Sequence, residues 1–145
     1  MVIEKLKNKV VFLDTAPLIY FIEGNSEYQE NLKKLFEYND DGYFKFITSP
    51  ITLLEVLVKP LKLKETQIVD QYRTLLTEAD GIDIYDITTS ISIRAAETRA
   101  KYNIPTPDAI QIATSIDRQA QFFLTNDNRL RSITEIKVIT ISELA

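Results

Sequence analysis

Short apolar runs alternate with longer amphipathic segments along the whole chain, and this alternation restricts the possible folds more than any other feature of the sequence. The apolar runs predict strands at residues 10–13, 44–48, 82–85, 122–125 and 138–141. Strands that alternate with helices form mostly parallel sheets with helices on both faces. We therefore expect an α/β fold, a three-layer α/β/α sandwich around a mostly parallel sheet of about five strands.

The segments between the strands predict helices. Pro17 suits the first turn of a helix that ends near residue 23. The spacing of Ser26 and Gln29 is typical of a capping box that opens a second helix. Ser49 opens a third helix, which Pro60 is expected to close. Further helices are predicted near residues 68–76, 89–102 and 107–120.

The composition limits the chemistry that the chain could perform. It has no cysteine and no histidine among its 145 residues. Disulfides, thiolate catalysis, histidine-based triads and the usual zinc and iron ligand sets are therefore excluded. Any catalysis would depend on carboxylates, hydroxyls, Lys, Arg, Tyr or a bound hard cation.

Length and patterning predict a single domain over residues 1–145, because there is no internal repeat and no Gly/Ser-rich linker. The first residues are charged, and the apolar run that follows stops at Asp14. That run is too short for a signal peptide or a membrane span, so we expect a cytoplasmic protein that does not bind membranes. The net charge of −4 argues against a general nucleic-acid coat protein but leaves a nuclease open.

Four acidic residues fall where this fold would bring side chains together. Asp14 directly follows the first predicted strand, and Asp127 follows the fourth by two residues. Glu55 lies one to two turns into the helix after the second strand, and Asp108 begins a helix after a Pro-Thr-Pro turn. Ligand sites in parallel sheets lie beyond the carboxyl ends of the strands, so all four acids can reach one site. Hard oxygen ligands select Mg²⁺ or Mn²⁺ rather than zinc or copper.

Two of the four acids also have a plainer interpretation. Asp108 could cap a helix or interact with its dipole, and Asp127 could be part of an Asx turn. Asp14 ends the apolar run of residues 10–13 and is expected at a buried strand end, and Glu55 is surrounded by apolar residues that suggest a half-buried side chain. Buried carboxylates are normally paired or bound to a metal, so the four acids together favour a site.

These segments together resemble the PIN domain. The resemblance lies in Asp14-Thr15 after the first strand, Thr52-Leu-Leu-Glu55-Val, Pro105-Thr-Pro-Asp108-Ala and Leu124-Thr-Asn-Asp127-Asn. It spans about residues 9–141, and at this length the chain is similar to the VapC-type toxins of toxin–antitoxin pairs.

The resemblance implies an Mg²⁺- or Mn²⁺-dependent endoribonuclease, with RNA as its substrate. It places Asp14, Glu55, Asp108 and Asp127 at the catalytic, metal-binding positions, with Thr125 and Thr15 in support. It also implies a homodimer and a small protein antitoxin as partners.

Several alternatives stay open. A PIN-like scaffold could bind RNA or a protein without cleaving. A phosphatase of the haloacid-dehalogenase type would need a second Asp where Ala16 stands, and a receiver-type phosphoacceptor domain would need paired acids near the first strand. Basic residues near the acids could bind phosphates or simply be solvated: Lys59, Lys62, Lys64, Arg129 and Arg131. The apolar residues of the early helices could be core or an exposed dimer patch: Leu35, Phe36, Ile68 and Tyr72.

Overall fold

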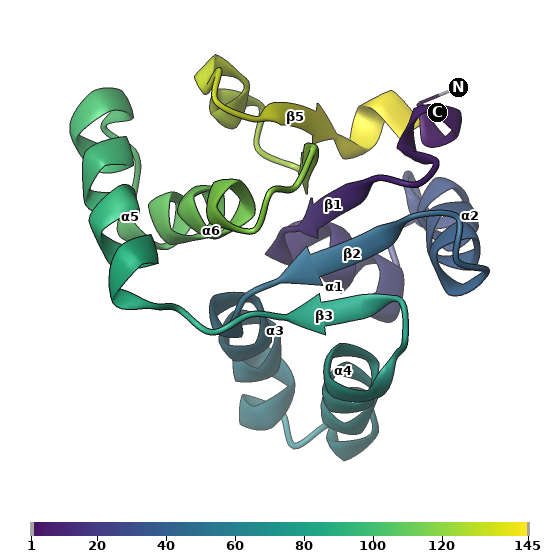
Figure 1. Cartoon of the computed structure of the whole chain (residues 1–145). Helices are drawn as coiled ribbons and strands as arrows, with labels where there is room; N and C mark the ends of the chain where they lie inside the picture. Colours follow the sequence, from purple (N-terminus) through teal and green to yellow (C-terminus); the bar gives the residue numbers. More distant parts are fainter. Residues whose placement is uncertain (1, 145) are drawn as a thin grey trace.

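A computed structural model describes residues 2–144 and contains a five-stranded sheet in which neighbouring strands are all parallel (Figure 1). The strands are β1 (Val10–Leu13), β2 (Lys45–Thr48), β3 (Ile82–Ile84), β4 (Phe122–Thr125) and β5 (Lys137–Thr140). Their order is β3-β2-β1-β4-β5, so β1 lies at the centre of the sheet. The predicted fold class and parallel sheet are confirmed.

Six α-helices connect these strands within the described residues. They are α1 (Thr15–Glu23), α2 (Gln29–Asp40), α3 (Pro50–Lys62), α4 (Thr66–Glu78), α5 (Thr89–Tyr102) and α6 (Thr106–Asp117). Short 3-10 helices are η1 (Ile3–Leu6), η2 (Asn128–Ser132) and η3 (Ile141–Leu144). Helices α1 to α4 lie on one side of the sheet, while α5 and α6 lie on the other (Figure 1).

The side chains of the central strand divide between the two layers of helices, because successive residues of a strand point to opposite faces. Val11 packs in the core formed with α1 to α4, whereas Phe12 packs against α6. The Phe12 ring stacks on Phe123 of β4 with 5.1 Å between ring centroids. Since both faces of the sheet are buried in this way, its functional groups can reach solvent only at the strand ends.

Two helix starts differ from the prediction. Helix α1 begins at Thr15, two residues before Pro17, and still tolerates the proline because first-turn N–H groups have no partner in the helix. The predicted capping box at Ser26 is wrong. Helix α2 is preceded by Tyr28, and the side chain of Asn25 accepts the Tyr28 backbone N–H at 3.1 Å. Asn25 therefore shapes the turn that Ser26 was expected to cap.

Two helix ends also differ. Pro60 does not close α3, which continues to Lys62 because a proline near the last turn removes only one hydrogen bond. The chain turns after it at Lys64, which has a φ of 57°. Helix α6 ends at Asp117, three residues before the predicted end near residue 120. Gln119 adopts a φ of 60°, and this left-handed conformation stops the helix.

The apolar residues of the early helices belong to the core. Leu35, Phe36 and Tyr72 are buried, and Ile68 is partly buried, so they do not form an exposed dimer patch. The large apolar side chains that are exposed lie elsewhere, at Leu54, Val58, Leu61, Leu63 and Ile93. No helix within residues 2–144 has the length and apolar character needed to cross a membrane.

Candidate active site

A surface cavity of about 370 Å³ opens at the carboxyl ends of β1 and β4. Its lining contains all six residues singled out from the sequence, namely Asp14, Thr15, Glu55, Asp108, Thr125 and Asp127. Ala16, Ile19 and Asn126 complete the lining. The fold thus brings four separate segments of the chain to one place, as the parallel topology predicts.

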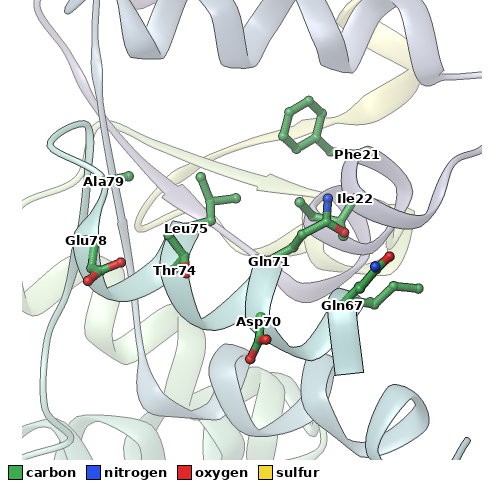
Figure 2. Close-up of a pocket in the computed structure, with 10 residues that line it drawn as sticks. Phe21, Ile22, Gln67, Asp70, Gln71, Thr74, Leu75, Glu78 and Ala79 are labelled. Atoms are coloured by element: carbon green, nitrogen blue, oxygen red, sulfur yellow. The ribbon is translucent and has the colours of Figure 1, made fainter. Parts of the chain in front are cut away.

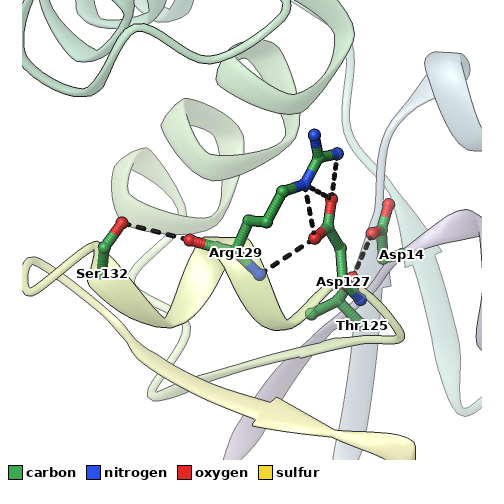
Figure 3. A network of polar contacts seen from close by, with 5 residues as sticks. All are labelled: Asp14, Thr125, Asp127, Arg129 and Ser132. Atoms are coloured by element: carbon green, nitrogen blue, oxygen red, sulfur yellow. Dashed lines mark hydrogen bonds and ion pairs between the residues drawn. The ribbon is translucent and has the colours of Figure 1, made fainter.

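Asp14 is held by the neighbouring strand. Pairing of β1 with β4 sets Leu13 opposite Leu124, and the Asp14 backbone N–H donates to the Leu124 carbonyl at 3.1 Å. The buried hydroxyl of Thr125 donates to Asp14 Oδ2 at 2.7 Å and accepts the Asp127 backbone N–H at 3.1 Å (Figure 3). Burial raises the pKa of Asp14, and the Thr125 hydroxyl opposes that rise. No cationic side chain between Val2 and Leu144 pairs with Asp14, so hydrogen bonds alone stabilise its ionised form.

Asp108 lies in the first turn of α6 and is half-buried. Its pKa is raised by burial and by the negative charges of Asp14 and Asp127. Within residues 2–144 its carboxylate accepts no hydrogen bond, so helix capping does not account for its position. The mutual repulsion shows that Asp14, Asp108 and Asp127 share one electrostatic environment.

Asp127 is the acid with a counter-ion. Arg129 Nε donates to Asp127 Oδ1 at 3.0 Å, and Arg129 Nη2 donates to Oδ2 at 2.7 Å (Figure 3). Oδ1 also accepts the Arg129 backbone N–H at 3.0 Å, so Asp127 caps η2. This is the geometry of the Asx turn that is the alternative interpretation of Asp127 from the sequence. The hydrogen-bonded guanidinium lowers the pKa of Asp127, and its charge also opposes the rise at Asp108.

Glu55 differs from the prediction, because its side chain is exposed rather than half-buried. The helix α3 buries Thr52 and Val56, which lie one turn apart on one face, and leaves Leu54 exposed beside Glu55. The apolar run therefore continues onto the solvent side of the helix. Glu55 still faces the cavity, where its Oε1 accepts the hydroxyl of Thr15 at 3.2 Å.

Sequence reasoning missed a buried polar link between the two helices that carry Asp108 and Glu55. Ser49 Oγ donates to Gln111 Oε1, and Gln111 Nε2 donates to Thr52 Oγ1 at 2.6 Å. All three side chains are buried. Gln111 lies one turn after Asp108 and Thr52 one turn before Glu55, so the link fixes how far apart these acids lie. Its sequence signal is a glutamine within the apolar stripe of α6.

The donor set fits a hard divalent cation in its chemistry, since carboxylate and hydroxyl oxygens are the ligands that Mg²⁺ and Mn²⁺ prefer. The raised pKa values of Asp14 and Asp108 also favour a cation site, because a bound cation would offset the cost of burying their negative charges. The ligands are not yet gathered, however. Between Val2 and Leu144, no group of at least three acidic side chains could hold a metal ion as placed.

A larger cavity of about 890 Å³ lies between α1 and α4 (Figure 2). Volume alone would favour it as a binding site. Its lining is mainly apolar, with Phe21, Ile22 and Leu75 among the residues that face it. Asp70 and Glu78 are the acids in its lining, eight positions apart on α4. The chemistry of the smaller cavity therefore makes it the better candidate for catalysis.

Comparison with known families identifies the fold. A family model described as PIN domain matches residues 11–136, a stretch that includes all six cavity residues named above. The chain belongs to the PIN-domain family. The PIN fold of this chain is also that of solved VapC toxins, so the predicted resemblance is confirmed. A search of curated proteins found no match.

Solved PIN structures cover nearly the same length. A toxin–antitoxin complex from Klebsiella pneumoniae contains a chain 24% identical with a TM-score of 0.69, covering 91% of this chain and 97% of that chain. The sarcin–ricin-loop-cleaving toxin VapC20 of Mycobacterium tuberculosis is 14% identical with a TM-score of 0.70, covering 88% and 98%. VapBC2 of Rickettsia felis, bound to a promoter DNA fragment, is 16% identical with a TM-score of 0.66, covering 90% and 98%.

Proposed function

We propose that this PIN-domain protein is a divalent-metal-dependent endoribonuclease and the toxin component of a toxin–antitoxin pair. One observation carries the proposal: the four acids named from the sequence line one cavity at the carboxyl edge of the sheet. Two of them are half-buried carboxylates whose pKa values are raised by burial. Membership of the PIN-domain family and similarity to VapC toxins support this assignment.

Each acid has a role in this proposal. Asp14 would anchor the metal site, because Thr125 fixes its carboxylate and burial makes a cation favourable there. Glu55 and Asp108 would hold an ion beside it, while Asp127 would hold a second ion or orient the attacking water. Thr15 would position Glu55 through their hydrogen bond. Mg²⁺ or Mn²⁺, when bound, supplies an activated water and stabilises charge on the phosphate.

The products follow from this arrangement. Hydrolysis by a water molecule would leave a 5′-phosphate and a 3′-hydroxyl and needs no histidine, which the chain lacks. Metal-free ribonucleases use the RNA 2′-hydroxyl as nucleophile and leave a cyclic phosphate instead. The ends of the product therefore distinguish the two chemistries.

We propose two protein partners. A small antitoxin is supported by the Klebsiella structure, which is a toxin–antitoxin complex. A second copy of the chain is supported by α3, where Leu54, Val58 and Leu61 are exposed at spacings of four and three residues and so share one face. Light scattering of the wild type and of Leu54→Lys tests the dimer, which the lysine would dissociate. We also propose that the protein acts in the cytoplasm, where its RNA substrate would be found.

A non-cleaving scaffold that binds RNA or a protein is the second candidate. It is favoured by one observation, that the acids within the described part of the chain are not gathered closely enough to hold an ion. The two candidates differ in whether an ion draws these carboxylates together.

Cleavage of a mixed pool of structured RNAs tests the proposal. The purified protein is incubated with Mg²⁺, with Mn²⁺ or with EDTA, beside Asp14→Asn and the exposed control variant Asp70→Asn. We expect metal-dependent cutting by the wild type and Asp70→Asn, products with 5′-phosphate ends, and at least about a hundred-fold loss in Asp14→Asn. Cutting that persists in EDTA, or that is equal in Asp14→Asn, would overturn the proposed chemistry.

A further inference from the structure

The candidate metal site already contains a cation that belongs to the chain. Arg129 on η2 directs its guanidinium at Asp127 and makes three side-chain hydrogen bonds to it, from Nε at 3.0 and 3.2 Å and from Nη2 at 2.7 Å (Figure 3). Within residues 2–144, the side-chain hydrogen bonds of Arg129 all go to this one carboxylate.

We propose that Arg129 is a built-in counter-ion that competes with the divalent cation for Asp127, and that its side chain must leave this carboxylate when the ion binds. The inference rests on the proposed function, because it concerns the same metal site. It adds a residue that tunes how strongly that site takes up its ion.

Both oxygens of Asp127 are engaged by Arg129. Oδ1 accepts Nε and the Arg129 backbone N–H, while Oδ2 accepts Nη2 and Nε. A metal ion that takes Asp127 as a ligand therefore has to break at least one charge-assisted bond. In the part of the chain that the structure describes, the other acids have no cationic partner: Asp14 and Glu55 each accept one hydroxyl, from Thr125 and Thr15. The guanidinium thus neutralises one acid of the four before any ion arrives.

The Arg129 side chain is free to move away. Its side chain is 78% exposed, compared with 28% for Asp127, so water can solvate the guanidinium after it leaves. The backbone need not follow, because the Arg129 carbonyl stays bonded to the Ser132 hydroxyl at 3.1 Å. Rotation of the Arg129 side chain therefore suffices to free Asp127 Oδ2, while Oδ1 keeps its bond to the Arg129 backbone N–H.

Arg131, two residues further on, provides a matched comparison. Its guanidinium pairs with Glu143 and donates to Thr140 Oγ1 at 3.1 Å, which joins η2 to β5 and η3. Replacing either arginine by glutamine removes the same charge from the same 3-10 helix. Only Arg129→Gln removes a competitor for a cavity carboxylate.

The size of the effect follows from the exposure of the pair. An exposed ion pair changes an equilibrium constant by up to about five-fold. We therefore expect Arg129→Gln to bind Mn²⁺ about two- to five-fold more tightly than the wild type. If Arg129 instead had a purely structural role and held Asp127 ready for the ion, Arg129→Gln would bind Mn²⁺ more weakly than the wild type.

Mn²⁺ binding, measured by electron paramagnetic resonance of the free ion at fixed ionic strength, tests this inference. The wild type is compared with Arg129→Gln, Arg131→Gln, Asp14→Asn and the conservative Arg129→Lys. We expect the gain in Arg129→Gln, a smaller gain in Arg129→Lys, and an affinity within about two-fold of the wild type in Arg131→Gln. Circular dichroism melts establish that each variant is folded. If Arg129→Gln is unfolded, Arg129→Lys replaces it as the variant that tests the inference.

The outcomes separate the two proposals. If Mn²⁺ binding depends on Asp14 but Arg129→Gln binds no more tightly than Arg131→Gln, the competing role of Arg129 is wrong and the metal site stands. If neither the wild type nor Arg129→Gln binds Mn²⁺ in a manner that depends on Asp14, the metal site is wrong and this inference is overturned with it.

Discussion

Thr125 and Asp14 lie 111 residues apart in the sequence, yet the Thr125 hydroxyl donates a 2.7 Å hydrogen bond to the Asp14 carboxylate. The parallel pairing of β1 with β4 produces this contact, because Leu13 and Leu124 are opposite each other and the next residue of each strand faces the same edge. The bond fixes the orientation of a carboxylate that burial makes costly to ionise. A positioning role for Thr125 can be tested against a threonine on β2, the strand on the other side of β1.

Thr125→Val is expected to lower the free energy of unfolding by about 1–3 kcal/mol, because it removes the partner of Asp14 and of the Asp127 backbone N–H. It should also weaken Mn²⁺ binding about ten-fold, since a hydrogen bond to a metal ligand orients that ligand. Urea unfolding and a Mn²⁺ titration measure the two effects.

Thr48→Val is the matched control for this change. Thr48 is equally buried on β2, and its hydroxyl donates to the Leu13 carbonyl at 2.8 Å rather than to a carboxylate. It should lower stability by about the same 1–3 kcal/mol and leave Mn²⁺ affinity within about two-fold. Equal losses of Mn²⁺ affinity in both variants would show that Thr125 acts only through stability.

The pH dependence of stability without metal should change in Asp14→Asn. Burial raises the native pKa of Asp14 above its unfolded value of about 3.9. Between these two pKa values the native state binds more protons, so the free energy of unfolding falls as the pH rises through that window. Asp14→Asn removes this loss and should melt a few degrees higher than the wild type at pH 7 in EDTA.

Asp108 changes the free energy of unfolding with pH in the same direction as Asp14, because its pKa is also raised. Asp127 acts with the opposite sign: its pKa is lowered, so its contribution is present above about pH 3.9 and is lost as the pH falls through its native pKa. Melting curves between pH 3 and pH 8 in EDTA measure the balance. A wild type that is more stable than Asp14→Asn at pH 7 would contradict the burial of an uncompensated charge at Asp14.

Millimolar Mn²⁺ should raise the melting temperature of the wild type by mass action. At a concentration 100 times the dissociation constant, the expected gain in stability is about 2.7 kcal/mol. The gain should be absent in Asp14→Asn and retained in Asp70→Asn, whose acid lines the other cavity. Equal shifts in all three proteins would mean that Mn²⁺ binds elsewhere.

Gln111 and Ser49 should be strongly coupled. Gln111→Leu removes the acceptor of the Ser49 O–H and the donor to Thr52 Oγ1, both buried, so we expect it to cost about 2–4 kcal/mol of stability. Ser49→Ala in that background should cost less than it does in the wild type, because the bond to Gln111 is already gone and only the cap to the Ile51 backbone N–H is lost. A double-mutant cycle in urea measures the coupling, and additive losses would argue against a connected network.

The positions of the strands and of the acids could be predicted from the sequence because both depend on local pattern. The run from Val10 to Leu13 is a strand by composition, and a carboxylate directly after it has to lie at the strand end. The parallel topology then brings Asp14 and Asp127 to the same edge without any knowledge of side-chain contacts.

What the sequence could not predict depends on tertiary contacts and on individual side-chain orientations. Glu55 and Leu54 both lie on the solvent side of α3. The apolar residues around Glu55 do not indicate which side of the helix faces solvent. The pairing of Arg129 with Asp127 depends on a short 3-10 helix that has no sequence period of its own. Gln111 finds its partners on another helix, far away in the chain.

The location of a bound metal ion tests the central claim most directly. Crystals of the wild type soaked in Mn²⁺ and measured for anomalous scattering would show where the ion lies. We predict an anomalous peak in the cavity lined by Asp14 and Asp108, about 2.0–2.3 Å from their carboxylate oxygens, with the Arg129 side chain turned away from Asp127. A peak elsewhere on the molecule, with this cavity empty at saturating Mn²⁺, would contradict the account.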